Sequence, residues 1–116
     1  MSEHHQIDLV ELRASSQDER DRLTEFYAKS FGWKYTDWGE LYSDTHDSGL
    51  TSGIDVEPKQ PNNTLVVIYS NNLDASMKTI IDAGGDITVE TYEFPGGKRF
   101  HFHDPIGNEV AVWSDK

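Results

Sequence analysis

The sequence contains no cysteine at any of its 116 positions. This absence excludes disulfides, thiolate metal ligands and a cysteine nucleophile. No segment approaches the ~20 consecutive apolar residues that a membrane-spanning helix requires, and the first six residues lack the apolar stretch of a signal peptide. We therefore expect a cytoplasmic protein without a membrane partner.

Basic residues are also scarce, since ten Lys and Arg face twenty-one Asp and Glu and the formal net charge is −11. Binding a phosphate backbone requires clustered positive charge, so we expect no nucleic-acid partner. The negative charge either favours cationic and neutral ligands through its long-range field or serves solubility alone.

Two common catalytic signatures are missing as well. The chain has no Gly-x-Ser-x-Gly nucleophile motif and no glycine-rich phosphate loop, and Gly96-Gly97 fits a hairpin connection better than the start of a helix. The hydrophobic fraction is only 35%, yet it includes three Trp, five Tyr and five Phe, which bury large areas. The composition thus predicts a folded domain with a real core.

The first half of the chain predicts a strand, a helix and a strand meander. Apolar and polar residues alternate over 7–14, which indicates a strand. Ser16 and Glu19 form an N-terminal capping pattern and Gly32 a C-terminal one, so we expect a helix over 17–31. Its charged residues 17–22 should be solvated, and its inner face should consist of Leu23, Phe26, Tyr27 and Phe31. Three short strand segments follow at 33–38, 40–45 and 50–57.

The second half repeats this order after a polar link over 58–63. A β-branched strand is expected over 64–69, followed by a helix that Asn71, Asn72 or Asp74 caps and that ends at Gly84-Gly85. The expected inner face of this helix consists of Leu73, Met77, Ile80 and Ile81. Further strands are predicted at 87–94, 98–104 and 109–113.

A strand, a helix and three strands therefore occur twice. A repeated unit that cannot bury its sheet face alone should pack against its copy. We predict an α+β fold of two tandem βαβββ modules, about 7–57 and 64–114, which form a curved mixed sheet around a shared cleft in one domain, 1–116. A ferredoxin-like sandwich is the alternative, although it has one strand fewer for each helix.

Several short motifs occur in the order found in one known superfamily. They are Phe26-Tyr27 with Phe31-Gly32-Trp33, Leu73-Asp74-Ala75 with Ala83-Gly84-Gly85, and Arg99-Phe100 followed by Asp104-Pro105-Ile106-Gly107-Asn108-Glu109 and Val110-Ala111-Val112-Trp113. Together they resemble the glyoxalase/bleomycin resistance protein/dioxygenase superfamily, also called the vicinal oxygen chelate (VOC) superfamily. In its last turn, Pro105 fixes φ, Gly107 can take a positive φ, and Asp104 and Asn108 can bond local backbone.

This resemblance implies a metal site that the residues do not support. Enzymes of the superfamily commonly place His, Gln or Glu on the first and last strand of each half, where these residues hold a divalent cation. The equivalent positions fall near Leu9, Gly53, Leu65 and Ala111, with Asp55 as a possible substitute for Gly53. We therefore expect no metal and no other cofactor.

His101, His103 and Glu109 are the candidate catalytic residues. The two histidines alternate with Phe100 and Phe102, so they should share one strand face. They could act as acids and bases or as a displaced metal set; the alternative is that they are solvated or bond neighbouring side chains. His4 and His5 lie in a terminal segment that we expect to be mobile.

The candidate ligand-binding residues are mostly aromatic or acidic, and they would suit a planar or cationic small molecule. They are Glu11, Trp33, Trp38, Tyr42, Tyr69, His101, His103, Glu109 and Trp113. The alternative is that these rings fill the interior or a dimer interface.

We therefore predict a metal-independent small-molecule binding protein, which the resemblance suggests is a homodimer. One alternative is an enzyme similar to lactoylglutathione lyase or to the dioxygenases, with a non-standard metal site. Another is a regulatory or interaction module without a ligand.

Overall fold

A computed structural model describes residues 2–56 and 63–116 of the chain. The chain divides into two compact units. The N-terminal unit is Leu9–Thr64, and the C-terminal unit combines the residues up to Asp8 with Leu65–Lys116. Residues 57–62, which hold most of the predicted link, lie outside the described part.

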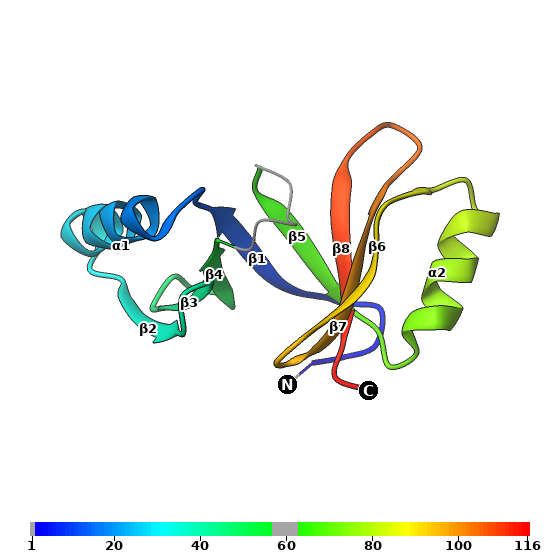
Figure 1. Cartoon of the computed structure of the whole chain (residues 1–116), viewed down its shortest axis with the longest axis horizontal. Coiled ribbons are helices and arrows are strands. Elements are labelled where there is room, and N and C mark those ends of the chain that lie inside the picture. The colour runs from blue at the N-terminus through cyan, green and yellow to red at the C-terminus, as the bar shows by residue number, and fades with distance from the viewer. Residues whose placement is uncertain (1, 57–62) are drawn as a thin grey trace. The chain divides into compact units, whose positions relative to one another are not determined.

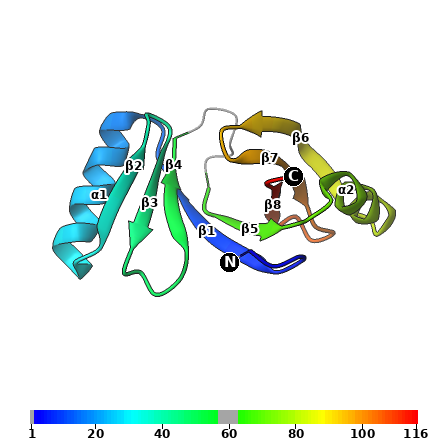
Figure 2. The same ribbon diagram turned by 90° about the horizontal axis from the view of Figure 1, so that it is seen from below.

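The N-terminal unit contains β1 (Ile7–Arg13) from Leu9 onward, α1 (Gln17–Phe31), β2 (Lys34–Trp38), β3 (Tyr42–His46) and β4 (Ser52–Asp55). Its strands follow the order β2-β3-β4-β1, and β1 runs parallel to β4 while the other neighbours are antiparallel. Figure 2 shows α1 running alongside β2 and β3.

The C-terminal unit contains β5 (Leu65–Tyr69), α2 (Leu73–Asp82), β6 (Asp86–Phe94), β7 (Gly97–His103) and β8 (Glu109–Ser114). Its order is β5-β8-β7-β6, with β5 parallel to β8 and the other neighbours antiparallel (Figure 1). The predicted α+β fold of two βαβββ modules with mixed strand directions is therefore confirmed.

Both helices begin at the residues that the sequence indicates. The Ser16 side chain accepts a hydrogen bond from the Glu19 N–H, and the Asn72 side chain accepts one from the Ala75 N–H. Glu19 reaches back to the Ser15 N–H at 2.7 Å, and this backbone bond lowers the pKa of the Glu19 carboxyl. Gly32 ends α1 at a φ of 75°, a conformation that favours glycine.

The packing of α1 differs from the expectation at three positions. Phe26 and Phe31, predicted to face inward, are 57% and 65% exposed. Arg20, predicted to be solvated, is buried, and its Nη1 donates to the carbonyls of Gly39 and Glu40 at 3.2 Å each. Helical periodicity alone misplaced these residues because the guanidinium takes the inward place beside the β2–β3 turn.

The apolar contacts between α1 and its sheet are correspondingly few. Ala14, Ile54 and Val56 form the buried cluster. Partly buried Leu12, Leu23 and Tyr35 pack against it. The sheet face toward α1 thus carries Leu12, Tyr35 and Ile54.

The C-terminal unit has the larger apolar core. Leu73, Phe100 and Val112 are buried, and Met77, Ile80, Ile87 and Phe102 pack against them. Of the predicted inner face of α2, only Ile81 is exposed. Within the described residues, no helix is long and apolar enough to cross a membrane.

Candidate functional site

The C-terminal unit carries a row of polar side chains on the sheet face opposite α2. Phe100 and Phe102 point toward α2, so Arg99, His101 and His103 point to the other face. The register places His103 opposite Glu109 on β8. His101, His103 and Glu109 therefore lie on one face of the sheet, as the sequence predicts.

These side chains form a continuous chain of hydrogen bonds. Arg99 Nε donates to His101 Nε2 at 3.3 Å. His101 Nδ1 lies 3.4 Å from Glu109 Oε2, and His103 Nε2 lies 2.9 Å from Glu109 Oε1. Because His101 Nε2 accepts a bond from arginine, the proton of a neutral His101 ring must lie on Nδ1, facing the glutamate. We name Arg99, His101, Glu109 and His103 the β7–β8 polar row.

Burial differs sharply along this row. The side chain of His101 has no exposed surface, whereas that of His103 is 43% exposed. Of the two alternatives given for the histidines, bonding to neighbouring side chains holds for both, whereas solvation applies only in part and only to His103. Glu109 orients His103 through one ring nitrogen, which leaves the other nitrogen able to exchange a proton.

Tyr69 and Trp113 lie beside this row on neighbouring strands and form an edge-to-face pair at 5.2 Å. The Tyr69 hydroxyl donates to Asp115 Oδ1 at 2.5 Å, and Trp113 Nε1 donates to Asp8 Oδ2 at 2.9 Å. The bond to Asp115 raises the pKa of Tyr69, and it lowers the pKa of Asp115. The polar tips of both rings are therefore held by carboxylates.

Three candidate residues of the N-terminal unit lie on the sheet face opposite α1. Glu11 precedes Leu12, which faces α1, so Glu11 points to the other face. Tyr42 pairs with the residue that follows Ile54, and Trp38 pairs with Tyr42, so both of these rings share the face of Glu11. Glu11 is buried, Tyr42 is half-buried, and Trp38 is 62% exposed. The Trp38 indole Nε1 donates to Asp44 Oδ2 at 2.6 Å, which fixes the exposed ring.

Trp33 does not join these residues. Its ring stacks on Tyr27 of α1 at 5.0 Å and lies 5.6 Å from Phe31. It belongs to an aromatic cluster at the end of α1. Its role in ligand binding stays a prediction, and the rings that it contacts are not candidate ligand-binding residues.

A tyrosine lies over Gly53, the position predicted for a metal ligand in the N-terminal unit. A Cβ atom added to Gly53 would overlap the Tyr42 hydroxyl and would lie 2.5 Å from Tyr42 Cζ and 2.8 Å from the Ser43 carbonyl oxygen. The ring of Tyr42 therefore takes the space that a ligand side chain at position 53 would need.

The other three positions carry no donor atom either. Leu9 is half-buried, while Leu65 and Ala111 are fully buried and apolar. Across residues 2–56 and 63–116, no group of three or more His, Asp or Glu side chains is arranged to hold a metal ion. The side chains at the four predicted positions thus offer a metal no donor atom, and Asp55, the possible substitute for Gly53, forms an ion pair with Arg13 at 3.4 Å.

The turn between β7 and β8 has the hydrogen bonds that the sequence predicts. Asp104 Oδ1 accepts bonds from the N–H groups of Ile106, Gly107 and Asn108, and Gly107 has a φ of 102°. The Asn108 side chain donates to Asp104 Oδ2 at 2.8 Å and, with the backbone bonds, lowers the pKa of Asp104. This turn positions Glu109 at the start of β8.

Sequence reasoning missed several polar partners of these residues. Four residues that bond a candidate residue are absent from the predicted site: Arg99, Asp44, Asp8 and Asp115. Only Arg99 could have been found from the sequence, because it follows the same strand alternation as His101. The terminal histidines were also misjudged, because His5 N–H donates to the Tyr69 carbonyl and His4 Nδ1 accepts from the Asn71 N–H.

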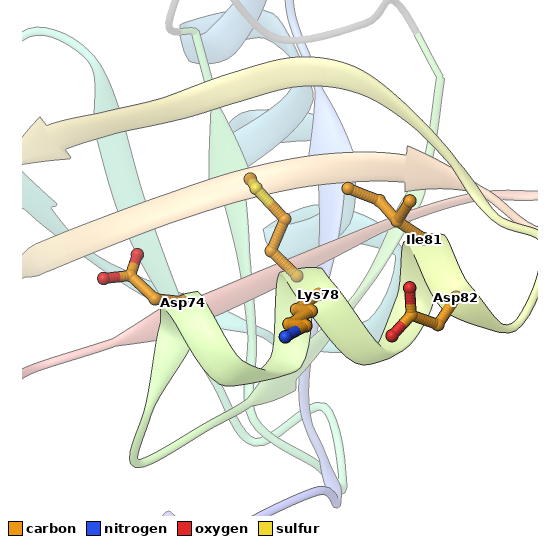
Figure 3. Close-up of a pocket in the computed structure, with 5 residues that line it drawn as sticks. Asp74, Lys78, Ile81 and Asp82 are labelled. Carbon is orange, nitrogen blue, oxygen red and sulfur yellow. The ribbon is translucent and has the colours of Figure 1, made fainter.

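A shallow groove along α2 is lined by Asp74, Met77, Lys78, Ile81 and Asp82 (Figure 3). Its volume of about 250 Å³ is below the ~300–1,000 Å³ typical of small-molecule pockets. It contains none of the candidate residues.

Comparison with known proteins adds information about the fold. No family model matches the sequence, and no curated protein matches it. Among solved structures, a Legionella pneumophila protein described as an NAD-dependent benzaldehyde dehydrogenase has a TM-score of 0.73 at 15% identity, covering 93% of this chain and 98% of that one.

Two further structures carry names from the superfamily. Methylmalonyl-CoA epimerase from Mycobacterium tuberculosis has a TM-score of 0.65 at 11% identity, covering 93% of this chain and 86% of that one. The Mn(II)-bound glyoxalase from Novosphingobium aromaticivorans has a TM-score of 0.60 at 18% identity; the match covers 99% of this chain but only 40% of the glyoxalase. The chain therefore has the VOC fold, as its sequence motifs predict.

Proposed function

We propose that this protein is a metal-independent small-molecule binding protein with a glyoxalase-related fold. One observation carries the proposal: none of the four positions predicted to correspond to the superfamily's metal ligands has a side-chain donor atom, and Tyr42 occupies the space beside Gly53. A fold hosts many functions, so the residues of the site rather than the likeness must decide between them.

The face of the N-terminal unit opposite α1 offers the groups that a ligand would use. Trp38 presents an exposed ring that its bond to Asp44 holds in place, and Tyr42 lies on the adjacent strand. A fixed indole face with nearby oxygen acceptors favours planar or cationic compounds through stacking and cation–π contact.

The test begins with protein treated with EDTA and dialysed. Calorimetric titration with Ni²⁺, Zn²⁺, Mn²⁺ and Fe²⁺ should show no tight one-to-one binding. A thermal-shift screen of planar aromatic compounds should then give hits that EDTA does not weaken, that Trp38→Ala removes and that Trp33→Ala retains. Stoichiometric metal binding, or hits that require metal, would contradict the proposal.

A second candidate function rests on the His103–Glu109 pair. The 2.9 Å contact to Glu109 and the partial exposure of His103 suit a general acid or base that works without metal. Such an enzyme would move a proton next to a carbonyl group.

This candidate has its own readout. Carbonyl compounds that raise the melting temperature would be incubated with the protein in D2O, and NMR would follow deuterium uptake beside the carbonyl. Catalysed uptake that His103→Gln and Glu109→Gln abolish, but His46→Gln leaves intact, would establish the acid–base role. Absence of catalysed uptake would leave the binding function alone.

A further inference from the structure

The two strands at the ends of the strand orders, β2 and β6, are protected very differently. β6 has register shifts between Ile87 and Val89 and between Val89 and Tyr92, and it exposes Glu90 and Glu93. Bulges and exposed charges of this kind prevent an edge strand from pairing with another chain. β6 is therefore a blocked edge.

β2 has no bulge, although its Lys34 and Asp37 side chains are exposed. Its five residues pair with β3 in an unbroken antiparallel register from Lys34 to Trp38, and it contains no proline or glycine. In the part of the chain that the structure describes, β3 is its only strand neighbour. Because β3 covers only one side of β2, one row of its backbone groups faces away from the sheet, and four of its five residues are exposed.

We propose that β2 is the surface through which two copies of this chain pair, strand against strand, in an antiparallel dimer. The register follows from symmetry. Because a two-fold axis places a residue opposite itself, only the axis at Thr36 pairs all five residues of both strands. An axis one residue later would bring two Asp37 carboxylates together, which is unfavourable.

Charge and ring complementarity support this register. With Thr36 on the axis, Lys34 of each copy lies opposite Trp38 of the other on the same sheet face. The exposed Lys34 ammonium would then lie over an indole whose N–H is bonded to the Asp44 carboxylate, so the second copy and the ligand proposed above would compete for the Trp38 ring. A cation on an aromatic face beside a carboxylate is favourable, and symmetry makes the pair twice.

Exposed apolar side chains lie just before and just after β2, where the pairing would bring those of the two copies together. Phe31, 65% exposed, lies just before the strand and packs on Trp33, while Leu41, 43% exposed, lies just after it. Antiparallel pairing brings the start of one strand to the end of the other. The exposed rings of one copy would therefore meet Leu41 of the second copy on the side of the sheet that α1 covers.

Two features oppose the dimer and set its expected strength. Each copy has a net charge of −11, so the copies repel at low ionic strength. The area that a five-residue strand pair buries is also small compared with the ~1,200–2,000 Å² that stable interfaces bury. We expect a dissociation constant on the order of micromolar, weaker at low salt than at physiological salt.

The experiment exploits the absence of cysteine, because a single introduced thiol can form a disulfide only between copies. Thr36→Cys would lie opposite itself, within the ~4.4–6.8 Å Cα separation that a disulfide requires. Lys34→Cys would lie about 13 Å from its mate, since four residues of strand separate them. In a glutathione buffer, Thr36→Cys should form the covalent dimer at least about tenfold more completely than Lys34→Cys or the distant Lys78→Cys.

Sedimentation equilibrium provides a second test that does not depend on the cysteine variants folding. Lys34→Glu should raise the dimer dissociation constant about tenfold more than Lys78→Glu, since the change acts twice in the interface while the net charge of the two variants is equal. A monomer at millimolar concentration, equal cross-linking of the three cysteine variants, or equal effects of the two glutamate variants would each overturn the proposal. In the last case any dimer must use another surface.

Discussion

The two units follow the same order of elements but hold their helices in different ways. In the C-terminal unit, α2 is held by a contiguous apolar core around Leu73, Phe100 and Val112. In the N-terminal unit, the buried apolar cluster is smaller and buried Arg20 supplies hydrogen bonds from α1 to the β2–β3 turn. Repetition of topology therefore does not imply repetition of packing.

This difference indicates a division of roles. Apolar burial is the dominant favourable term in folding, so the C-terminal unit should contribute more of the stability. The N-terminal unit leaves the aromatic rings of Phe26 and Phe31 exposed on α1 and that of Trp38 exposed on the opposite sheet face, and exposed apolar side chains can mark contact sites. Both the proposed ligand surface and the proposed dimer strand lie in that unit.

The largest expected effect comes from truncating the core of the C-terminal unit. Phe100 is fully buried, so Phe100→Ala should lower the free energy of unfolding by about 3–5 kcal/mol. Leu23→Ala, the corresponding change in α1, should cost roughly half of that or less, since Leu23 is only partly buried. Urea denaturation followed by circular dichroism measures both; equal losses would remove the contrast between the two cores.

An intermediate effect is expected from Arg20. Arg20→Ala should cost about 1.5–3 kcal/mol, because it leaves two turn carbonyls without their charged donor. Arg22→Ala, an exposed change in the same helix, should stay within about 0.5 kcal/mol of the wild type. Indistinguishable melting curves for the two variants would mean that the buried guanidinium does not hold α1.

The smallest effect concerns the response of each unit's turn to acid. The pKa of Asp104 is lowered by its bonds to Asn108 and the backbone, so its contribution to stability is present above the unfolded value of about 3.9 and is lost as the pH falls below it. Asp104→Asn should therefore reduce the fall in melting temperature between pH 6 and pH 3.

Asp47→Asn is the control in the N-terminal unit, where Ser48 makes the side-chain bonds of the β3–β4 turn. It should leave the acid response unchanged. If both variants respond to acid as the wild type does, the bonds of the Asp104 turn do not contribute to stability.

Local signals predicted much of this fold because they depend on neighbours in sequence. Ser16, Gly32 and Asp104 all act within five residues, and each behaves as expected. The failures involve choices between faces: Arg20 and Phe26 both fit a helix, and only the tertiary partners decide which one turns inward.

The candidate site could be predicted only as far as strand alternation extends. Alternation placed His101, His103 and Glu109 on one face correctly in relation to Phe100. It gave no indication that Tyr42 covers Gly53, since that contact depends on how β3 pairs with β4. Cross-strand partners such as Trp38 and Asp44 were missed for the same reason.

The contact between Tyr42 and Gly53 also restricts how this sequence can evolve. Any single substitution that places a carboxylate or imidazole at position 53 collides with the tyrosine ring and the Ser43 carbonyl. A metal ligand at position 53 would therefore require a change at Tyr42 as well as at Gly53.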